Sequence, residues 1–153
     1  MIKVREFRKY IREIEREVEH QLKSQTGCCG VTLPQCHALM ELDDMGPVGI
    51  IDLAKRLRLD TSTLSRTVDS LVREGFVERN VNPENRRFVI VNLTDRGQAK
   101  ADEINGACDR FYHDLLDGFP ESHSVILETV KRLSELLSSR KDGICCERPG
   151  GKF

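Results

Sequence analysis

The sequence of 153 residues contains no tryptophan, and its aromatic residues amount to only 5%. No apolar run approaches the roughly 20 residues that a membrane-spanning helix requires. The charged N-terminal segment, residues 1–6, lacks the apolar centre of a secretory signal peptide. We therefore expect a cytoplasmic protein without membrane contact, in which the six cysteines are thiols rather than a disulfide framework.

The sequence also lacks the patterns on which most enzymes depend. It shows no Ser-His-Asp order, no phosphate-binding glycine loop and no paired-carboxylate signature, so no enzymatic activity is expected. The net charge does not indicate a nucleic-acid partner, since the sequence has 24 Lys and Arg residues and 25 Asp and Glu residues. Residues 48–96 hold nine basic and seven acidic residues, an excess of the sign expected for DNA binding but a small one.

What the sequence does contain is a helix-turn-helix pattern between residues 50 and 73. Apolar residues recur at helical spacing in both halves, Leu59 lies in the turn, and Asp60 is a favoured N-cap for the second helix. Two strands, at residues 76–79 and 87–93, are predicted to follow and to form a hairpin. This order is typical of a winged helix-turn-helix, which reads the major groove of DNA.

Long amphipathic helices flank this pattern. The first is expected to stop in a loop at residues 26–30, before a capping box at Thr32 and Gln35 opens the next helix. Two further helices follow Thr94 and are separated by a break at residues 118–120. A winged core of about 50 residues cannot cover all of their apolar stripes, so a symmetric homodimer is expected. The first stripe consists of Phe7, Ile11, Ile14, Val18 and Leu22.

The predicted fold is therefore mainly α with a small β wing. A winged helix-turn-helix DNA-binding region occupies residues 33–94, with Leu64, Val68, Leu71 and Val72 of its second helix facing the core. Dimerisation helices occupy residues 1–32 and 95–140, and a cysteine-containing flexible tail occupies residues 141–153.

Several motifs resemble those of the MarR family of bacterial winged-helix regulators: Leu33–Gln35, Asp52–Ala54, Ser62–Arg66, Leu71–Gly75, Asn85–Arg87 and Leu93–Gly97. The resemblance implies a dimer that binds a palindromic operator in double-stranded DNA, with one helix in the major groove and a wing arginine in the minor groove. Asn85 departs from the family pattern, which usually has an aspartate that holds an arginine there. Carried over to this sequence, the DNA-binding residues are Ser62, Thr63, Ser65 and Arg66, with Arg86 and Arg87 in the wing.

The residues themselves agree with this interpretation. Ser62, Arg66, Asp69 and Arg73 lie opposite the apolar stripe of their helix, where they face solvent or DNA. Short hydroxyl side chains permit close approach of the backbone, and one arginine can contact guanine through two hydrogen bonds. An ordinary solvated helix face would carry similar residues.

Two adjacent-cysteine pairs, Cys28-Cys29 and Cys145-Cys146, suggest a regulatory input. Adjacent Cα atoms are about 3.8 Å apart, whereas disulfides prefer about 4.4–6.8 Å, so such a pair bridges itself poorly. It can instead offer two thiolates to one soft ion, and we expect arsenic(III), cadmium or zinc to bind the four cysteines. Redox sensing through disulfides between subunits and thiols without a role are the alternatives.

A second candidate site follows from the family resemblance. One branch of the family represses zinc-uptake genes and binds zinc between the first loop, the second helix and the fifth helix. Matching its zinc ligands to this sequence gives Cys28 or Cys29 in the loop, with Cys36, His37, Glu103 and Cys108 in the two helices. Ile104 occupies the position of a further histidine ligand. The exchange of nitrogen for sulfur favours softer ions than zinc. Cys36 and Cys108 also lie on apolar stripes, where cysteine is often a small core residue.

The expected function is that of a dimeric repressor whose DNA affinity is controlled by a soft metal or metalloid ion. Redox sensing, or sensing of a small phenolic ligand in an apolar cleft, would suit the same family. A winged-helix protein-interaction module and a thiol metal carrier are alternatives outside gene regulation. Steep salt dependence of DNA binding would distinguish a regulator from these two.

Overall fold

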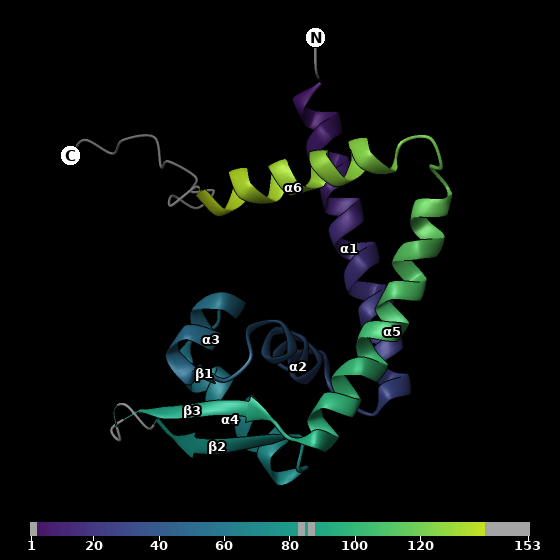
Figure 1. Cartoon of the computed structure of the whole chain (residues 1–153). Coiled ribbons are helices and arrows are strands. Elements are labelled where there is room, and N and C mark those ends of the chain that lie inside the picture. The colour runs from purple at the N-terminus through teal and green to yellow at the C-terminus, as the bar shows by residue number, and fades with distance from the viewer. Residues whose placement is uncertain (1–2, 83–84, 86–87, 140–153) are drawn as a thin grey trace, which may run out of the picture. The chain divides into compact units, whose positions relative to one another are not determined.

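The computed structural model describes residues 3–82, 85 and 88–139, and within residues 25–28 only the course of the helix (Figure 1). The chain divides into two compact units, Met1–Phe111 and Tyr112–Phe153. The mainly helical fold with a small antiparallel sheet confirms the predicted fold class. The described elements are α1 (Val4–Cys29), α2 (Leu33–Met45), β1 (Val48–Gly49), α3 (Ile50–Leu57), α4 (Thr61–Arg73), β2 (Val77–Val81), β3 (Val89–Leu93), α5 (Asp95–Asp117) and α6 (His123–Ser139).

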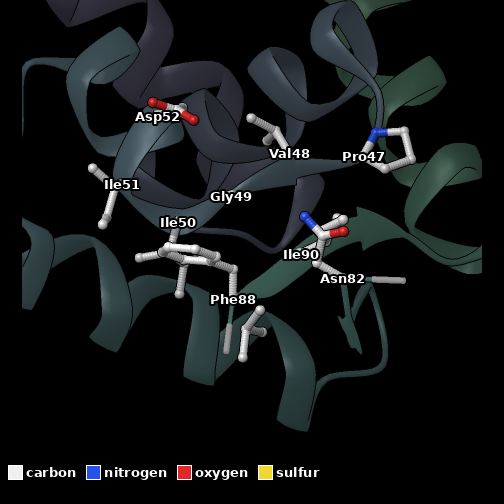
Figure 2. Close-up of a pocket in the computed structure, with 10 residues that line it drawn as sticks. Pro47, Val48, Gly49, Ile50, Ile51, Asp52, Asn82, Phe88 and Ile90 are labelled. Carbon is white, nitrogen blue, oxygen red and sulfur yellow. The ribbon is translucent and has the colours of Figure 1, made fainter. Parts of the chain in front are cut away.

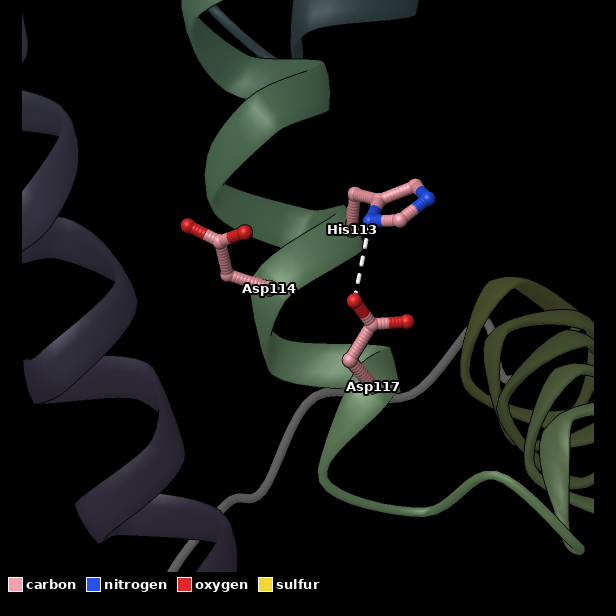
Figure 3. A group of neighbouring side chains, drawn as sticks. All are labelled: His113, Asp114 and Asp117. Atoms are coloured by element: carbon pink, nitrogen blue, oxygen red, sulfur yellow. Dashed lines mark ion pairs between the residues drawn. The ribbon is translucent and has the colours of Figure 1, made fainter.

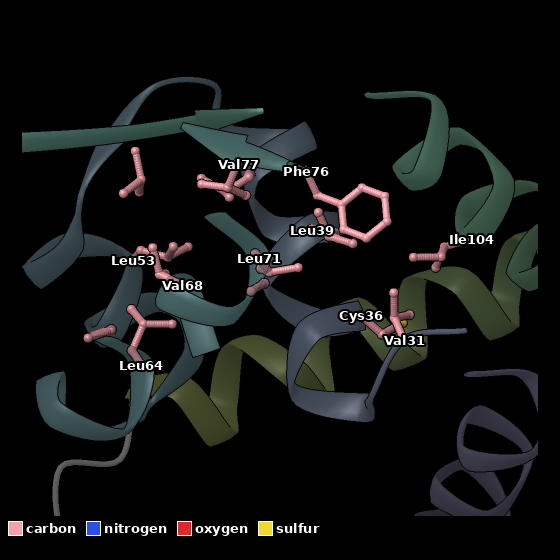
Figure 4. Close-up of a cluster of buried hydrophobic side chains, with 14 of the residues drawn as sticks. Val31, Cys36, Leu39, Leu53, Leu64, Val68, Leu71, Phe76, Val77 and Ile104 are labelled. Atoms are coloured by element: carbon pink, nitrogen blue, oxygen red, sulfur yellow. The ribbon is translucent and has the colours of Figure 1, made fainter. Parts of the chain in front are cut away.

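The core of the first unit lies where α2, α3 and α4 meet the sheet (Figure 4). Its largest fully buried side chains include Leu39 of α2, Leu53 of α3 and Leu71 of α4. Leu64 and Val68 complete the inward face of α4, at the helical spacing that the sequence predicts. The prediction for Val72 is wrong, because this side chain is 36% exposed, one helical step of about 100° from Leu71.

The sheet has three antiparallel strands in the order β1-β3-β2. Pairing of β2 with β3 runs from Val77 opposite Leu93 to Val81 opposite Val89, so both strands begin slightly later than predicted. Strand β1, which the sequence did not predict, has only two residues and is fixed by pairing of Val48 with Val91. The β2–β3 hairpin lies beside α3 and α4 (Figure 1).

Local capping signals set most helix boundaries. The predicted capping box is present: the Thr32 N–H donates to Gln35 Oε1 at 2.7 Å, and the Gln35 N–H donates to Thr32 Oγ1 at 3.4 Å. The predicted loop at residues 26–30 is wrong, because α1 continues to Cys29. It ends where Gly30 adopts the left-handed conformation with φ 69°.

The start of α5 is fitted tightly against the turn that follows α4. Thr94 Oγ1 donates to the Gly75 carbonyl at 2.7 Å and accepts from the Gly97 N–H at 3.0 Å. The Thr94 N–H donates to the Phe76 carbonyl at 3.0 Å. Gly97 is buried, and a Cβ atom there would lie only 1.8 Å from the Phe76 carbonyl oxygen. Only glycine therefore fits at this position.

Both units expose apolar helix faces, and none of the described helices is long and apolar enough to cross a membrane. Helix α1 exposes Phe7 and Ile14, with exposed fractions of 52% and 59%. Helix α6 buries none of its residues within the described chain. Its exposed apolar side chains are Val125, Leu127, Val130, Leu136 and Leu137.

Candidate nucleic-acid interface

The turn between α3 and α4 has the tight geometry of a helix-turn-helix. Arg58 ends α3 in the left-handed conformation, with φ 54° and ψ 39°. The Leu59 N–H then donates to the Ala54 carbonyl at 2.9 Å, which draws the turn back over α3. Asp60 caps α4, as predicted.

Asp60 also organises the side chains at the start of α4. Its carboxylate accepts hydrogen bonds from Ser62 Oγ at 2.5 Å, Thr63 Oγ1 at 2.5 Å and the Thr63 N–H at 2.8 Å. These bonds, that from Ser62 foremost, hold the pKa of the Asp60 carboxyl well below its usual range. Asp60 is therefore ionised at neutral pH, and it orients two of the hydroxyl groups predicted to face DNA.

Arg66 lies on the exposed face of α4, one turn beyond these hydroxyls. Within the described part of the chain it forms no ion pair. The neighbouring acidic residue Asp69 forms an ion pair with Arg79 of β2 at 2.6 Å, so the positive charge of Arg79 compensates its negative charge. Ser65 is half-buried, which makes it the least accessible of the predicted DNA contacts.

The wing is held by a side-chain network across β2 and β3. Asn92 Nδ2 donates to Glu78 Oε1 at 2.9 Å, and Asn80 Nδ2 donates to Asn92 Oδ1 at 2.9 Å. The bond from Asn92, and then that from Asn80, lowers the pKa of the Glu78 carboxyl. The predicted wing arginines Arg86 and Arg87 lie outside the described residues, so their role stays a prediction.

An apolar groove of about 690 Å³ lies between the start of α3 and the wing (Figure 2). Ile51 lines it from α3, and Phe88 lines it beside β3; both are about half exposed. Asp52 and Asn82 supply polar groups to the lining.

Cysteines from three helices pack in or against the same hydrophobic core. Cys36 of α2 and Cys108 of α5 are 1% and 6% exposed, and Cys29 of α1 packs against the same cluster. Cys36 lies beside Val31, with Ile104 nearby (Figure 4). Burial, and to a smaller extent Cys108 and Cys29, raises the pKa of the Cys36 thiol to about 11.

The same environment acts on Cys108. Burial foremost, with Asp109 and Cys29 adding to it, raises the pKa of this thiol. The structure thus brings together Cys36 and Cys108 of the second candidate site and Cys29 of the first. The family resemblance had offered Cys28 or Cys29 as the loop cysteine of the second candidate site, and the structure places Cys29 against the cluster that holds Cys36 and Cys108.

The other residues of the two predicted metal sites lie elsewhere or are not described. His37 is exposed, in a groove with Met40 and Arg56, and Glu103 is exposed and paired with Lys100 at 2.6 Å. The side chain of Cys28 lies outside the described part of the chain. The same holds for Cys145 and Cys146.

One group of possible metal ligands in the described chain has its ligand atoms within 4.8 Å of one another (Figure 3). It consists of His113, Asp114 and Asp117, and His113 Nδ1 lies 3.3 Å from Asp117 Oδ2. All three side chains are exposed, and the sequence analysis assigned them no role. Such an exposed ion-pair cluster is common on helix surfaces.

Gln35 of α2 forms hydrogen bonds to the end of α4 that the sequence did not predict. Its Nε2 donates to Glu74 Oε1 at 2.8 Å and to Ser70 Oγ at 3.3 Å, and the side chain is buried. The first turn of α2 is thereby tied to the C-terminal end of α4. The capping pattern revealed the local role of Gln35, but the contact across 39 residues required the packed fold.

Comparison with known proteins identifies the winged unit. The model of the MarR family matches residues 31–89, which run from the start of α2 into the wing. YfiV, an uncharacterised HTH-type transcriptional regulator of Bacillus subtilis, is 32% identical over 115 residues, covering 72% of this chain and 70% of that protein. The chain belongs to the MarR family. It is therefore a transcriptional regulator with a DNA-binding winged helix, not an enzyme.

Other MarR-family relatives extend the likeness beyond the winged unit. The structure of an Escherichia coli MarR mutant in complex with operator DNA is 25% identical, with a TM-score of 0.70, over 84% of this chain and 91% of that one. YdgJ, another uncharacterised regulator of Bacillus subtilis, is 24% identical over 107 residues. This chain spans 65% of the length of YdgJ, slightly less than two thirds.

Proposed function

We propose that this MarR-family regulator is a dimeric repressor that binds a palindromic operator and is released by a soft ion held by cysteine thiolates. The observation that carries the DNA-binding part is the exposed face of α4. There Arg66 projects beyond two hydroxyls that Asp60 has already oriented. The E. coli MarR structure bound to operator DNA supports the same use of the fold in this chain.

The dimer is supported by the apolar faces that each unit leaves exposed. Phe7 and Ile14 of α1 and Val130 and Leu137 of α6 are each more than half exposed, although they lie at helical spacings typical of packed faces. Large contiguous apolar patches on a protein surface mark association sites. A two-fold dimer would present two copies of α4 to two operator half-sites.

Control by a soft ion is supported by the positions of the thiols. Cys29, Cys36 and Cys108 gather at the junction of three helices, and Gln35, next to Cys36, contacts α4. An ion that moved the first turn of α2 would therefore act on the reading helix. Arsenic(III), cadmium and zinc are the candidate ions, since thiolates prefer soft partners.

A second candidate function is sensing of a small phenolic ligand. The groove between α3 and the wing supports it, because apolar side chains line most of the groove and Asp52 and Asn82 add polar groups (Figure 2). A ligand there would change the position of the wing relative to α3. Titration with a phenolic acid, monitored by DNA binding, would separate this mode from thiol control, because thiol-blocking reagents should not affect it.

Replacing Arg66 with alanine should weaken DNA binding by about 1–3 kcal/mol, since one arginine-base contact contributes about that much. The DNA is a duplex obtained by selecting, with the unaltered protein, from a random-sequence library. Arg16→Ala, which removes the same charge from the face of α1 opposite its apolar stripe, is the matched control. Fluorescence anisotropy in 50–200 mM salt measures both variants. Equal affinities of the two variants, or binding that does not weaken as salt rises, would contradict the DNA-binding surface.

A further inference from the structure

We propose that Asp60 makes Ser62 and Thr63 read DNA as hydrogen-bond acceptors only, so that each selects an exocyclic amino group of adenine or cytosine in the major groove. The inference rests on the proposed DNA-binding function and deepens it. The family resemblance names the two hydroxyls as DNA contacts, but it does not give the DNA groups that they recognise, and it assigns Asp60 no part in recognition. Asp60 is a positioning residue, because it acts on DNA through the two hydroxyls.

The chemistry of the three side chains fixes the direction of their hydrogen bonds. Asp60 is ionised at neutral pH, and an ionised carboxylate has no proton to donate. Ser62 Oγ lies 2.5 Å from Asp60 Oδ1, and Thr63 Oγ1 lies 2.5 Å from Asp60 Oδ2. Each hydroxyl has a single proton, so each donates that proton to Asp60. Only lone pairs remain on the two oxygens for contact with a ligand.

The two hydroxyl oxygens are accessible to DNA. Ser62 and Thr63 are exposed in the first turn of α4, and the first turn of the second helix contacts base edges in helix-turn-helix proteins. The carboxylate that orients them is itself held in place, because the Thr63 N–H donates to Asp60 Oδ1 at 2.8 Å. The orientation of both hydroxyls is therefore set before DNA binds.

This arrangement disfavours the contact that helix N-termini often make with nucleic acids. The N-terminus of a helix attracts phosphate through its free N–H groups and the helix dipole. In α4 the Asp60 carboxylate already accepts from an N–H of the first turn, and its negative charge repels a DNA phosphate. Phosphate oxygens are also acceptors, so they cannot bond to hydroxyls whose protons are already donated. Ser62 and Thr63 are thereby directed to the bases.

Among the polar groups that bases present in the major groove, the amino groups are the donors. Adenine presents N6–H₂ and cytosine presents N4–H₂, whereas N7 of both purines, guanine O6 and thymine O4 accept. Arg66, one turn further along α4, offers donors only and therefore complements guanine. Each operator half-site should thus present amino groups to Ser62 and Thr63 and a guanine to Arg66.

The test is a set of double-mutant cycles on the operator that the full, reduced chain selects from a random-sequence duplex library. Purine in place of adenine, or 2-pyrimidinone in place of cytosine, removes one amino group, and 7-deazapurines remove N7. Each duplex is titrated with the unaltered chain, Ser62→Ala and Thr63→Val. Loss of the recognised amino group should weaken binding by the unaltered chain about three- to tenfold, the effect of one hydrogen bond.

The variants separate this contact from the weaker base pairing of the analogues. Ser62→Ala and Thr63→Val should each be insensitive to loss of their own amino group, beyond the effect that pairing has on every variant. Loss of N7 from guanine should be coupled to Arg66→Ala and not to either hydroxyl variant, which makes Arg66 the matched control.

Asp60→Asn tests the positioning role without removing the cap, because asparagine caps helices about as well as aspartate. Its amide oxygen can keep the bonds from the Thr63 N–H and Ser62 Oγ, which leaves Nδ2 against Thr63 Oγ1. The amide then donates to Thr63, and the Thr63 proton becomes available to DNA. Thr63 should lose its coupling to an amino group, whereas Ser62 should keep it. Circular dichroism checks that the variant is folded.

Coupling of either hydroxyl to a purine N7, or to a phosphate replaced with an uncharged methylphosphonate, would overturn the acceptor assignment. A hydroxyl that couples to no amino group would overturn it for that residue. Unchanged coupling of Thr63 in Asp60→Asn would refute the role of Asp60. A library that yields no enriched operator would refute the proposed function itself, whereas an enriched operator without these couplings would refute this inference alone.

Discussion

Replacement of Gly97 with alanine should destabilise the winged unit by about 3 kcal/mol or more, at or above the upper end of the roughly 1–3 kcal/mol typical of overpacked sites. A Cβ atom there would lie 1.8 Å from the Phe76 carbonyl oxygen, a backbone atom that cannot rotate away. Relief would require α5 to separate from the turn after α4, with loss of the hydrogen bonds of Thr94. Urea unfolding monitored by circular dichroism measures the change in unfolding free energy.

Gly106→Ala provides a matched control in the same helix. A Cβ atom at Gly106 would meet only the end of the Arg110 side chain, 3.7 Å away. Because alanine favours helix over glycine, this variant should be more stable by about 0.5–1 kcal/mol. If the two variants unfolded at the same urea concentration, the close fit at Gly97 would be wrong.

The second large effect is expected from the exposed face of α1. A double variant, Phe7→Glu and Ile14→Glu, places two charges in the apolar face that we assign to the dimer, where burying them would be strongly unfavourable. Sedimentation velocity at micromolar concentration should show a dimer for the unaltered chain and no dimer for the variant. Operator binding should weaken at least 100-fold, because only one half-site can then be held per protein.

His20→Glu is the control for this experiment, since His20 is exposed on the face of α1 opposite the apolar stripe. It should leave both the dimer and operator affinity unchanged. A double variant that stays dimeric would exclude this face of α1 from the interface. A monomeric unaltered chain would refute the dimer as a whole, and with it the palindromic operator.

Local signals account for the parts of the fold that the sequence predicted well. Thr32 and Asp60 act within three residues of themselves, so their capping roles were evident before any packing was known. Periodicity likewise identified the core face of α4. It failed at Val72, because an apolar residue at the edge of a stripe can face either the core or solvent.

The candidate sites depended more on contacts between distant residues. The sequence indicated the exposed face of α4, but not that Asp60 holds Ser62 and Thr63. The spacing of the cysteines alone does not show that Cys29 packs near Cys36 and Cys108, and only the family resemblance offered Cys28 or Cys29 for the same site. The link between Gln35 and Glu74 similarly exists only once α2 has packed on α4.

The central claim, that this chain reads DNA as a dimer through α4 and the wing, is tested most directly by selection from a random-sequence duplex library. Sequencing of the bound pool from the reduced protein should reveal an inverted repeat whose half-site centres lie about one helical turn, or about 10 base pairs, apart. Enrichment should be lost in the Phe7→Glu and Ile14→Glu variant. A pool without enrichment, or one enriched in a single asymmetric site, would contradict the account.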